Sequence, residues 1–355
     1  DAAALTETAF GHLSRLVGQY GPRTSATDRE VAAARYIAAE LARAGFSASL
    51  QEFPVHVTPG HGRDLEITTP RPLKVETVAM AGSGEGTVTG RLVYVGLGRP
   101  EDIPSGGLAG AIALARRGLI PFGEKAENVR QAGGAGLVVF NSEQGLFGGN
   151  LGGQAAIPVV SISDADGQTL LGLIEAGPVT ASLTLRSEDR TSRNVVAVVN
   201  KGQGPVVVLG GHYDSVPESP GANDNASGTS VLLALAGEIA RKEWPFEVRI
   251  IAFGSEELGL LGSSHYVDSL PPAERARIAA MLNFDALGTG VLAATGDRSL
   301  LDAALSIARE LGIPLVDTGE PPNASSDHAS FRAAGVPVLF IAATDFSRIH
   351  TADDT

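Results

Sequence analysis

The hydrophobic and polar positions of the chain change their spacing near residue 64 and again near residue 194. Before the first change, apolar residues recur every three to four positions and predict a helix over residues 1–20. Gly21-Pro22 interrupts that pattern, and Thr27-Asp28-Arg29-Glu30 is typical of a capping box that opens a second helix to about Ala44. The alternation from Phe46 to Val55 then predicts a strand.

Between about Asp64 and Leu185, short apolar runs alternate with glycine-rich turns, which is typical of β-rich structure. One helix is expected near Ala126–Ala132. The expected strands are Leu73–Met80, Thr89–Val95, Ala111–Ala115, Gly136–Asn141, Ile157–Ile162 and Thr180–Leu185. The stretch holds no histidine and no cluster of acidic residues, so we expect it to carry no chemistry of its own.

From Asn194 onward, apolar runs alternate with helical patterns, and this alternation favours a mostly parallel sheet covered by helices. The expected strands are Val195–Val199, Val206–Gly210, Val248–Phe253, Met281–Phe284 and Val338–Ile341. The expected helices are Ala226–Arg241, Gly262–Leu270, Pro272–Ala279, Arg298–Leu311 and Ser326–Ala334. The sequence therefore predicts an α/β fold: a mostly parallel mixed sheet, flanked by helices, formed by residues 1–64 and 187–355 around a β-rich insert of residues 65–186.

Composition narrows the range of functions. The 355-residue chain has a net charge of −13 with scattered basic residues, which argues against nucleic acid or an anionic membrane as its partner. It has no cysteine, so disulfides, thiolate metal sites and cysteine nucleophiles are excluded, and any metal must be held by His, Asp and Glu. No apolar stretch is long enough to span a membrane.

The chain begins Asp1-Ala2-Ala3, without a methionine or a basic-then-apolar leader. We interpret it as a processed form from which a signal peptide has been removed, and expect a secreted or cell-envelope protein of bacterial type.

Acidic residues and histidines follow several of the predicted strands. His212 and Asp214 follow Val206–Gly210, and Asp285 closes the strand that ends at Phe284. Asp224, His350 and the pair Glu256-Glu257 complete the set. Open α/β sheets place ligand sites at the carboxyl ends of their strands, so we expect these side chains to lie together. Two histidines and several carboxylates are the ligands that a two-metal hydrolytic site requires.

Each of these residues, taken alone, has a plainer interpretation. His212 could simply end a strand, and Asp224 could cap the helix expected from Ala226. The pair Glu256-Glu257 is more informative, because two adjacent carboxylates after a buried strand are unfavourable unless a cation neutralises them. His328 is expected to support the site rather than bind a metal. Ser255 lacks the Gly-x-Ser-x-Gly turn, which excludes a serine nucleophile there.

Five short motifs together resemble metallopeptidase family twenty-eight, the co-catalytic di-zinc aminopeptidases. They are His212-Tyr213-Asp214-Ser215, Gly221-Ala222-Asn223-Asp224-Asn225-Ala226-Ser227-Gly228, Glu256-Glu257-Leu258-Gly259-Leu260-Leu261-Gly262-Ser263, Asn283-Phe284-Asp285 and His350-Thr351. The insert resembles a protease-associated (PA) domain in Leu114–Gly118, Phe122–Val129, Ala132–Asn141 and Ile157–Ile162.

The resemblance implies a role for each site residue. His212 and Asp285 would bind one Zn²⁺, Glu257 and His350 would bind the other, and Asp224 would bridge them. Glu256 would be the general base, and Asp214 would orient His212. Mn²⁺ or Co²⁺ could substitute for Zn²⁺, and a cis peptide bond is expected between Asp224 and Asn225.

The implied reaction is removal of N-terminal amino acids from peptides with a free N-terminus, with Glu256 activating a water that bridges the metals. The alternatives are a carboxypeptidase, a dipeptidase, a deacylase on the same scaffold, or a receptor-like homologue without catalysis. The intact ligand set and the position of the insert before His212 favour the aminopeptidase. A monomer and a dimer are both compatible with the sequence.

One departure from the family concerns the residue before His350. Family members often carry a tyrosine there to stabilise the oxyanion, whereas this chain has Ile349, and no tyrosine follows Tyr266. We therefore expect another donor to serve. The substrate pocket is expected to be walled by Gly288–Ala294, Pro321–Ser325 and Ala343–Arg348.

Overall fold

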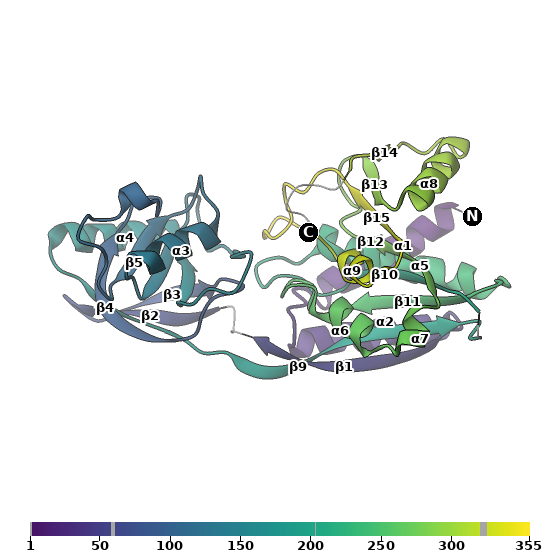
Figure 1. The fold of residues 1–355 in the computed structure, drawn as a ribbon, viewed down its shortest axis with the longest axis horizontal. Helices are drawn as coiled ribbons and strands as arrows, with labels where there is room; N and C mark the ends of the chain where they lie inside the picture. Colours follow the sequence, from purple (N-terminus) through teal and green to yellow (C-terminus); the bar gives the residue numbers. More distant parts are fainter. Residues whose placement is uncertain (1, 58–60, 203, 320–324) are drawn as a thin grey trace. The chain divides into compact units, whose positions relative to one another are not determined.

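The computed structural model describes residues 2–57, 61–202, 204–319 and 325–355, and the chain forms two compact units (Figure 1). One unit consists of Asp1–Val55 and Arg190–Thr355, and the other of His56–Asp189. The first unit contains all the residues predicted to bind metal or to act in catalysis.

The first unit is a sheet with helices on both faces. Its helices are α1 (Ala2–Gly18), α2 (Asp28–Arg43), α5 (Gly228–Ala240), α6 (Leu261–Ser269), α7 (Pro272–Arg275), α8 (Arg298–Glu310) and α9 (His328–Ala333). Its strands are β1 (Ser47–Val57), β9 (Glu188–Val199), β10 (Val206–His212), β11 (Glu247–Phe253), β12 (Ile278–Phe284), β13 (Leu292–Gly296), β14 (Leu315–Asp317) and β15 (Val338–Ala343). The helix predicted over Pro272–Ala279 is too long, because Ile278 already pairs with Val206 in the sheet.

The sheet is more mixed than the sequence predicted. Its order is β1-β9-β11-β10-β12-β15-β13-β14, and β11, β10, β12 and β15 run parallel to their neighbours within that group. However, β9 is antiparallel to β11, and β13 is antiparallel to β15. A parallel connection needs a crossover of about a dozen residues or more. Residues 200–205 and 285–291 are too few for one, so the chain reverses direction at both places.

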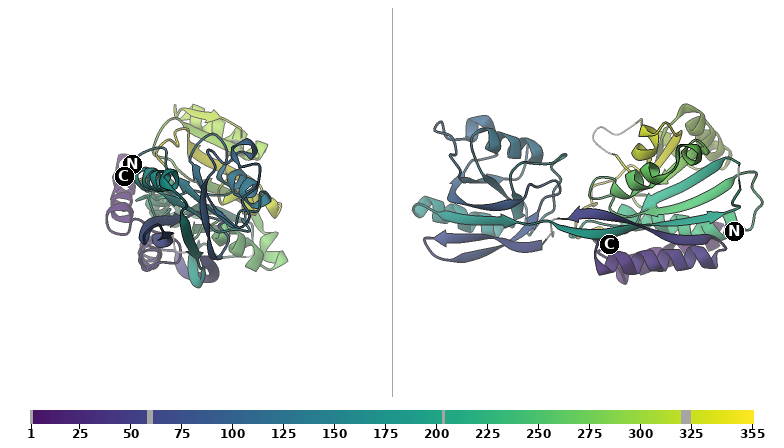
Figure 2. Two further views of the ribbon diagram at one scale, coloured as in Figure 1. Left: turned by 90° about the vertical axis from the view of Figure 1, so that its left-hand side faces the viewer. Right: turned by 60° about the horizontal axis from the view of Figure 1, so that its bottom comes forward.

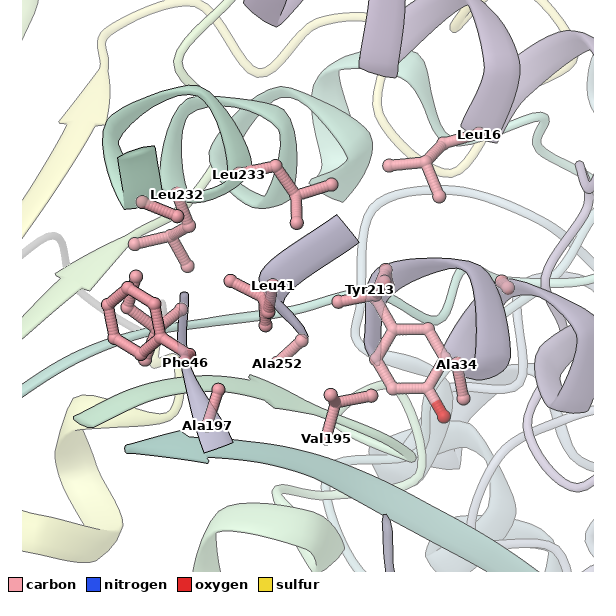
Figure 3. Close-up of a cluster of buried hydrophobic side chains, with 14 of the residues drawn as sticks. Leu16, Ala34, Leu41, Phe46, Val195, Ala197, Tyr213, Leu232, Leu233 and Ala252 are labelled. Atoms are coloured by element: carbon pink, nitrogen blue, oxygen red, sulfur yellow. The ribbon is translucent and has the colours of Figure 1, made fainter. Parts of the chain in front are cut away.

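Two hydrophobic cores explain the almost unbroken apolar run of β11. Ile250 and Ala252 face the core shared with α1, α2 and α5, whereas Ile251 and Phe253 face the core shared with α6 and α9. A strand buried on both faces loses the usual alternation of apolar and polar residues. Figure 3 shows the first of these cores around Leu41 and Leu233, and Figure 2 shows α1 and α2, in purple, on one side of the sheet.

The second unit is a closed barrel with strand order β2-β3-β7-β6-β5-β4-β8. Its elements are β2 (His61–Thr69), β3 (Leu73–Ala79), β4 (Gly86–Tyr94), β5 (Ile112–Arg116), α3 (Phe122–Gln131), β6 (Gly136–Phe140), β7 (Val159–Ile162), α4 (Asp164–Ala176) and β8 (Thr180–Leu185). The sequence prediction missed β2 and α4. Gly167 lies inside α4 because a Cβ there would come within 2.4 Å of the Phe140 side chain, so this glycine permits close packing and does not mark a turn.

Candidate metal and catalytic centre

The parallel strands β11, β10 and β12 carry most of the candidate site at their carboxyl ends. In the register of the sheet, His212 lies opposite Phe253, and Gly210 lies opposite Asn283. Residues that follow these positions, Glu256 and Asp285 among them, therefore emerge at one edge of the sheet. Asp224 reaches the same edge from the segment before α5, and His350 reaches it from the loop after β15.

The predicted ligands form three overlapping groups in which one nitrogen or oxygen of each residue lies within 4.8 Å of the others. The groups are His212, Asp224 and Asp285; Asp224, Glu257 and His350; and His212, Glu256 and Glu257. The structure thus brings all five predicted metal ligands and the predicted base together.

Asp224 lies between the two histidines. Its Oδ1 is 3.1 Å from His212 Nε2, and its Oδ2 is 3.1 Å from His350 Nε2. On one side, Asp285 Oδ1 is 3.3 Å from His212 Nε2; on the other, Glu257 Oε2 is 3.1 Å from His350 Nε2. A carboxylate that turns one oxygen toward each of two His–acid pairs has the arrangement of a bridging ligand.

Asp214 contacts the site differently from what the sequence predicted. The Nδ1 atom of His212 is 3.2 Å from the main-chain carbonyl of Asp214 but 3.6 Å from its carboxylate, so the carbonyl is the nearer partner. This contact favours the tautomer in which Nδ1 carries the proton and Nε2 faces Asp224. The Asp214 carboxylate instead accepts the backbone N–H groups of Glu256, at 3.1 Å, and Glu257, at 3.3 Å. Asp214 therefore orients the glutamate pair as well as His212.

Several residues of the site adopt left-handed backbone conformations. Ser255, directly before Glu256, has φ 55°; Ala286, directly after Asp285, has φ 52°; and His350 itself has φ 59°. Such conformations are unfavourable for residues with a Cβ and concentrate at functional sites. They turn the chain sharply at the strand ends and so aim the adjacent side chains into one small volume.

The segment that carries Asp224 packs very closely on the end of β12. A Cβ at Gly228 would come within 2.2 Å of the Phe284 carbonyl oxygen, so only glycine fits there. Asn225 donates from Nδ2 to the same carbonyl at 2.9 Å and accepts the N–H of Gly228 at 2.8 Å. The peptide bond between Asp224 and Asn225 is cis, which confirms the expectation from the family resemblance.

Burial and mutual repulsion disfavour the charged forms of the two glutamates. Burial, followed by the charge of Asp224, raises the pKa of Glu257 to about 7. Burial and the neighbouring Glu257 raise the pKa of Glu256 well above its usual range. Burial opposes protonation of His350, but Glu257 and Asp224 outweigh it and raise the pKa of His350 to about 11. Without a bound cation, the protein does not neutralise the carboxylates of this centre.

The donor set fits divalent metal ions. Oε1 of Glu257 and Oδ1 of Asp285 are buried, and neither accepts a hydrogen bond from any residue that the structure describes. Buried carboxylate oxygens without partners are costly unless a cation satisfies them. Imidazole nitrogens and carboxylate oxygens without thiolates suit zinc, and they also suit manganese and cobalt.

Buried charged residues next to the site were missed from the sequence, Arg23 and Asp327 among them. Arg23 is fully buried and donates to the main-chain carbonyls of Tyr213 at 2.6 Å and of Pro220 and Gly221 at 2.8 Å each. Asp327 is also fully buried, and burial raises its pKa to about 7. Neither has a sequence signal, because charged residues usually lie on the surface and no motif marks these two.

The remaining histidines of this unit pack against aromatic rings. His328 stacks on Phe340 with ring centroids 4.5 Å apart, and burial lowers its pKa to about 4. It therefore packs beside the site and contributes no ligand to the three groups, as the sequence suggested. His265 stacks on Phe53 at 5.1 Å.

The predicted pocket walls are only partly described. Residues 321–324 lie outside the described residues. Within Gly288–Ala294, the N–H of Gly288 donates to Asn223 Oδ1 at 2.6 Å, and Thr289 Oγ1 accepts from Asn223 Nδ2 at 3.1 Å. This segment is therefore joined directly to the residue before Asp224.

The fold and site define a class of α/β protein in which a shared carboxylate joins two His–acid clusters at the carboxyl edge of a mixed sheet. Comparison with known sequences agrees with this class. The sequence profile of peptidase family M28 matches residues 194–355, and the profile of the PA domain matches residues 88–170.

Individual relatives extend the similarity over nearly the whole chain. Aminopeptidase YwaD of Bacillus subtilis (strain 168) is 33% identical over 349 residues, which cover 92% of this chain and 73% of YwaD. The probable lipoprotein aminopeptidase LpqL of Mycobacterium tuberculosis is 32% identical, covering 94% of this chain and 72% of LpqL. The crystal structure of BSAP, a zinc aminopeptidase from Bacillus subtilis, superposes with a TM-score of 0.86 at 31% identity, covering 98% of this chain and 89% of BSAP. The chain belongs to peptidase family M28.

Proposed function

We propose that this protein is a zinc-dependent aminopeptidase that holds two metal ions and removes N-terminal residues from peptides. The observation that carries the proposal is the position of Asp224, whose two oxygens each lie 3.1 Å from a different histidine. The aminopeptidases YwaD, LpqL and BSAP, to which the chain is similar along most of its length, support the reaction and the metal.

His212 and Asp285 would hold one ion, Glu257 and His350 would hold the other, and Asp224 would be shared. Zinc, when bound, supplies a Lewis acid for the scissile carbonyl and acidifies water near neutral pH. The chain contributes a rigid frame for this chemistry, because three of the five ligands lie at or just beyond the ends of adjacent parallel strands.

Glu256 is the one residue of the cluster that is not assigned as a metal ligand, and we assign the proton transfer to it. Its carboxylate lies within the same cluster as His212 and Glu257, and its backbone N–H is held by Asp214. In the proposed reaction, Glu256 takes a proton from the attacking water and gives it to the leaving amine. Asp214 acts through the main chain of the glutamate pair and through the Nδ1 side of His212.

The alternatives drawn from the sequence are less well supported. A receptor-like homologue would not need a complete ligand set, and here all five ligands lie together. A carboxypeptidase, a dipeptidase or a deacylase on the same scaffold is disfavoured by the relatives, which are named aminopeptidases.

We also propose a division into domains and a location outside the cytoplasm. The division into residues 1–64 with 187–355 around an insert of 65–186 is supported by the two compact units and by the separate family matches. Export to the cell envelope or beyond is supported by the similarity to a lipoprotein aminopeptidase. No helix among the described residues is long and apolar enough to cross a membrane.

The decisive test is hydrolysis of a panel of aminoacyl p-nitroanilides, with N-acetylated and C-terminal-probe peptides as controls, before and after chelation and zinc return. Chelator-sensitive cleavage that requires a free N-terminus is the expected result. Cleavage of only blocked or C-terminal probes would replace the aminopeptidase with one of the alternatives. Absence of both cleavage and bound zinc would favour the receptor-like homologue.

Metal identity is tested with the same assay. The metal-free protein is reconstituted with Zn²⁺, Mn²⁺ or Co²⁺, and bound metal is counted by mass spectrometry. Two zinc ions per chain with recovered activity are expected, and a single ion at full activity would overturn the two-metal arrangement.

A further inference from the structure

Asp354 binds the segment that carries the shared carboxylate. Its Oδ1 accepts the backbone N–H of Asn223 at 2.6 Å, and its Oδ2 accepts that of Asp224 at 3.1 Å. Oδ2 also lies 3.5 Å from the hydroxyl of Ser219, and the main-chain carbonyl of Asp354 accepts the N–H of Ala222 at 3.2 Å. Asp354 therefore accepts its hydrogen bonds from one short stretch, residues 219–224.

That stretch lies between β10 and α5 and cannot satisfy its polar groups through a sheet ladder. Buried backbone groups need partners from elsewhere in such a case. Arg23 supplies donors to the carbonyls of Pro220 and Gly221, and Asp354 supplies acceptors for the N–H groups of Asn223 and Asp224. Arg23 thus holds the stretch by donating hydrogen bonds to it, and Asp354 holds it by accepting hydrogen bonds from it.

Asp354 also lies close in sequence to the more exposed metal ligand. Its N–H donates to the Thr351 carbonyl at 3.3 Å, which closes a tight turn immediately after His350. His350 has a side chain that is 51% exposed, whereas the His212 side chain is 1% exposed at the end of β10. His350 therefore has less packing to fix it than His212 has, and this turn joins it to the Asp224 segment.

The neighbouring residue Asp353 provides a natural contrast. Asp354 is 3% exposed, whereas Asp353 is exposed, although the two have the same side chain and adjoin in the chain. A carboxylate is the suitable group at the buried position, because it only accepts hydrogen bonds and the groups that face it there all donate.

We infer that Asp354 is a positioning residue that fixes Asp224 and His350 relative to each other, and so sets the affinity of the metal position formed by Asp224, Glu257 and His350. The inference rests on the proposed two-metal function. The other position also uses Asp224, but its remaining ligands His212 and Asp285 are placed by β10 and β12, so it responds less to the loss of Asp354.

The competing interpretation is that Asp354 only anchors this part of the chain to the rest of the unit. An anchor would affect the stability of the metal-free protein and would leave the two zinc affinities in their original ratio. A positioning residue would change that ratio, because only one of the two metal positions contains His350.

The experiment compares Asp354→Asn with Asp353→Asn and with the unchanged protein. Asparagine keeps the shape but replaces one acceptor oxygen with a donor, which faces a backbone N–H. Metal-free proteins are titrated with Zn²⁺ by calorimetry, and their thermal unfolding is followed without metal. For Asp354→Asn we expect the weaker zinc affinity to fall by about 10–100-fold, the range typical for loss of an outer partner. The tighter affinity should change less, and excess zinc should restore activity.

Each outcome decides the inference. An unchanged ratio of the two affinities in Asp354→Asn, with or without a lower melting temperature, would overturn it. The same selective loss in Asp353→Asn would also overturn it, because that residue does not bind the segment. If the unchanged protein binds fewer than two zinc ions, the two-metal function itself fails, and this result is distinct from the other two.

Discussion

The two proposed metal positions of the site are built in different ways. His212 sits at the end of a central strand, is 1% exposed on its side chain, and has its Nδ1 atom against Asp214. His350 sits on a loop in a left-handed conformation, with its side chain 51% exposed. The sheet fixes the first position by packing, whereas the second depends on hydrogen bonds that join separate segments. We therefore expect the first to be preorganised and the second to be the more easily lost.

Replacing each histidine tests this difference with the largest expected effect. His212→Ala should remove most bound zinc and most activity, and should also destabilise the metal-free protein, because it empties a buried position. His350→Ala should retain about one zinc ion and a nearly unchanged metal-free melting temperature. Metal counting and thermal unfolding measure both.

His56→Ala is the matched control for these variants, because His56 is exposed and lies in the other unit. Equal zinc content and equal destabilisation in His212→Ala and His350→Ala would show that the two positions do not differ in the proposed way.

Glu256→Gln is expected to remove the proposed base while leaving both proposed metal positions intact. Loss of a general base typically costs about 10²–10⁴-fold in rate. We expect a decrease of that size in kcat with two zinc ions still bound. Glu257→Gln should instead lose zinc, since Glu257 faces His350 at 3.1 Å. A turnover close to that of the unchanged protein in Glu256→Gln would remove this residue from the mechanism.

Arg23→Lys tests how strongly the segment before Asp224 depends on the hydrogen bonds that Arg23 donates. Lysine keeps the charge but cannot reach the carbonyls of Tyr213, Pro220 and Gly221 together, because it lacks the planar fork of arginine. Each buried carbonyl left without a partner costs about 1–3 kcal/mol. We expect the free energy of unfolding of the metal-free protein to fall by about 2–5 kcal/mol in urea titration.

Arg29→Lys is the control, because Arg29 is exposed and donates to the carbonyl of the nearby Gly21 at 2.7 Å. Its effect should stay within about 0.5 kcal/mol. Similar losses in both variants would mean that Arg23 has no special role in the segment.

Glu30 gives the smallest effect; it is fully buried in the first turn of α2. Burial raises its pKa to about 8 from an ordinary value of 4.5, although Ser192 donates a hydrogen bond to it. The folded protein therefore binds this proton more tightly than the unfolded chain. The resulting stability is fully present below about pH 4.5 and is lost as the pH rises through about 8.

Glu30→Gln should flatten this decline when the metal-free protein is melted at intervals from pH 4.5 to 8 in the presence of chelator. Glu7→Gln, at an exposed position of α1, should leave the slope unchanged. Parallel pH profiles for the two variants would show that Glu30 does not cause the decline.

The sequence predicted the residues that cluster at the site better than it predicted the residues that support them. His212, Glu256 and Asp285 were found because each follows an apolar strand, and parallel strands end at a common edge. Arg23 and Asp354 were not found, because their roles depend on backbone groups of a distant segment, and no spacing in the sequence encodes such contacts. The same limit applies to Asp214, whose carboxylate contacts the glutamate backbone more closely than the imidazole.

The fold, like the site, was predicted only in part. Strands buried on both faces, such as β11, were predicted because their apolar runs are continuous. The antiparallel pairing of β13 with β15 was not predicted, because β13 is a short strand with small residues, Leu292-Ala293-Ala294-Thr295-Gly296, whose apolar signal is weak. Within the barrel, α4 contains Gly167 and Gly172, which resemble turn residues in sequence although both lie within a helix.

The order of the ligands along the chain has a consequence for synthesis. His212, Asp224, the glutamates and Asp285 all precede His350 and Asp354 in sequence. At about 5–20 residues per second of translation, the last ligand emerges on the order of 10 s after the first. The proposed metal position that contains His350 therefore cannot form on a nascent chain until the loop after β15 has left the ribosome, well after His212 has done so.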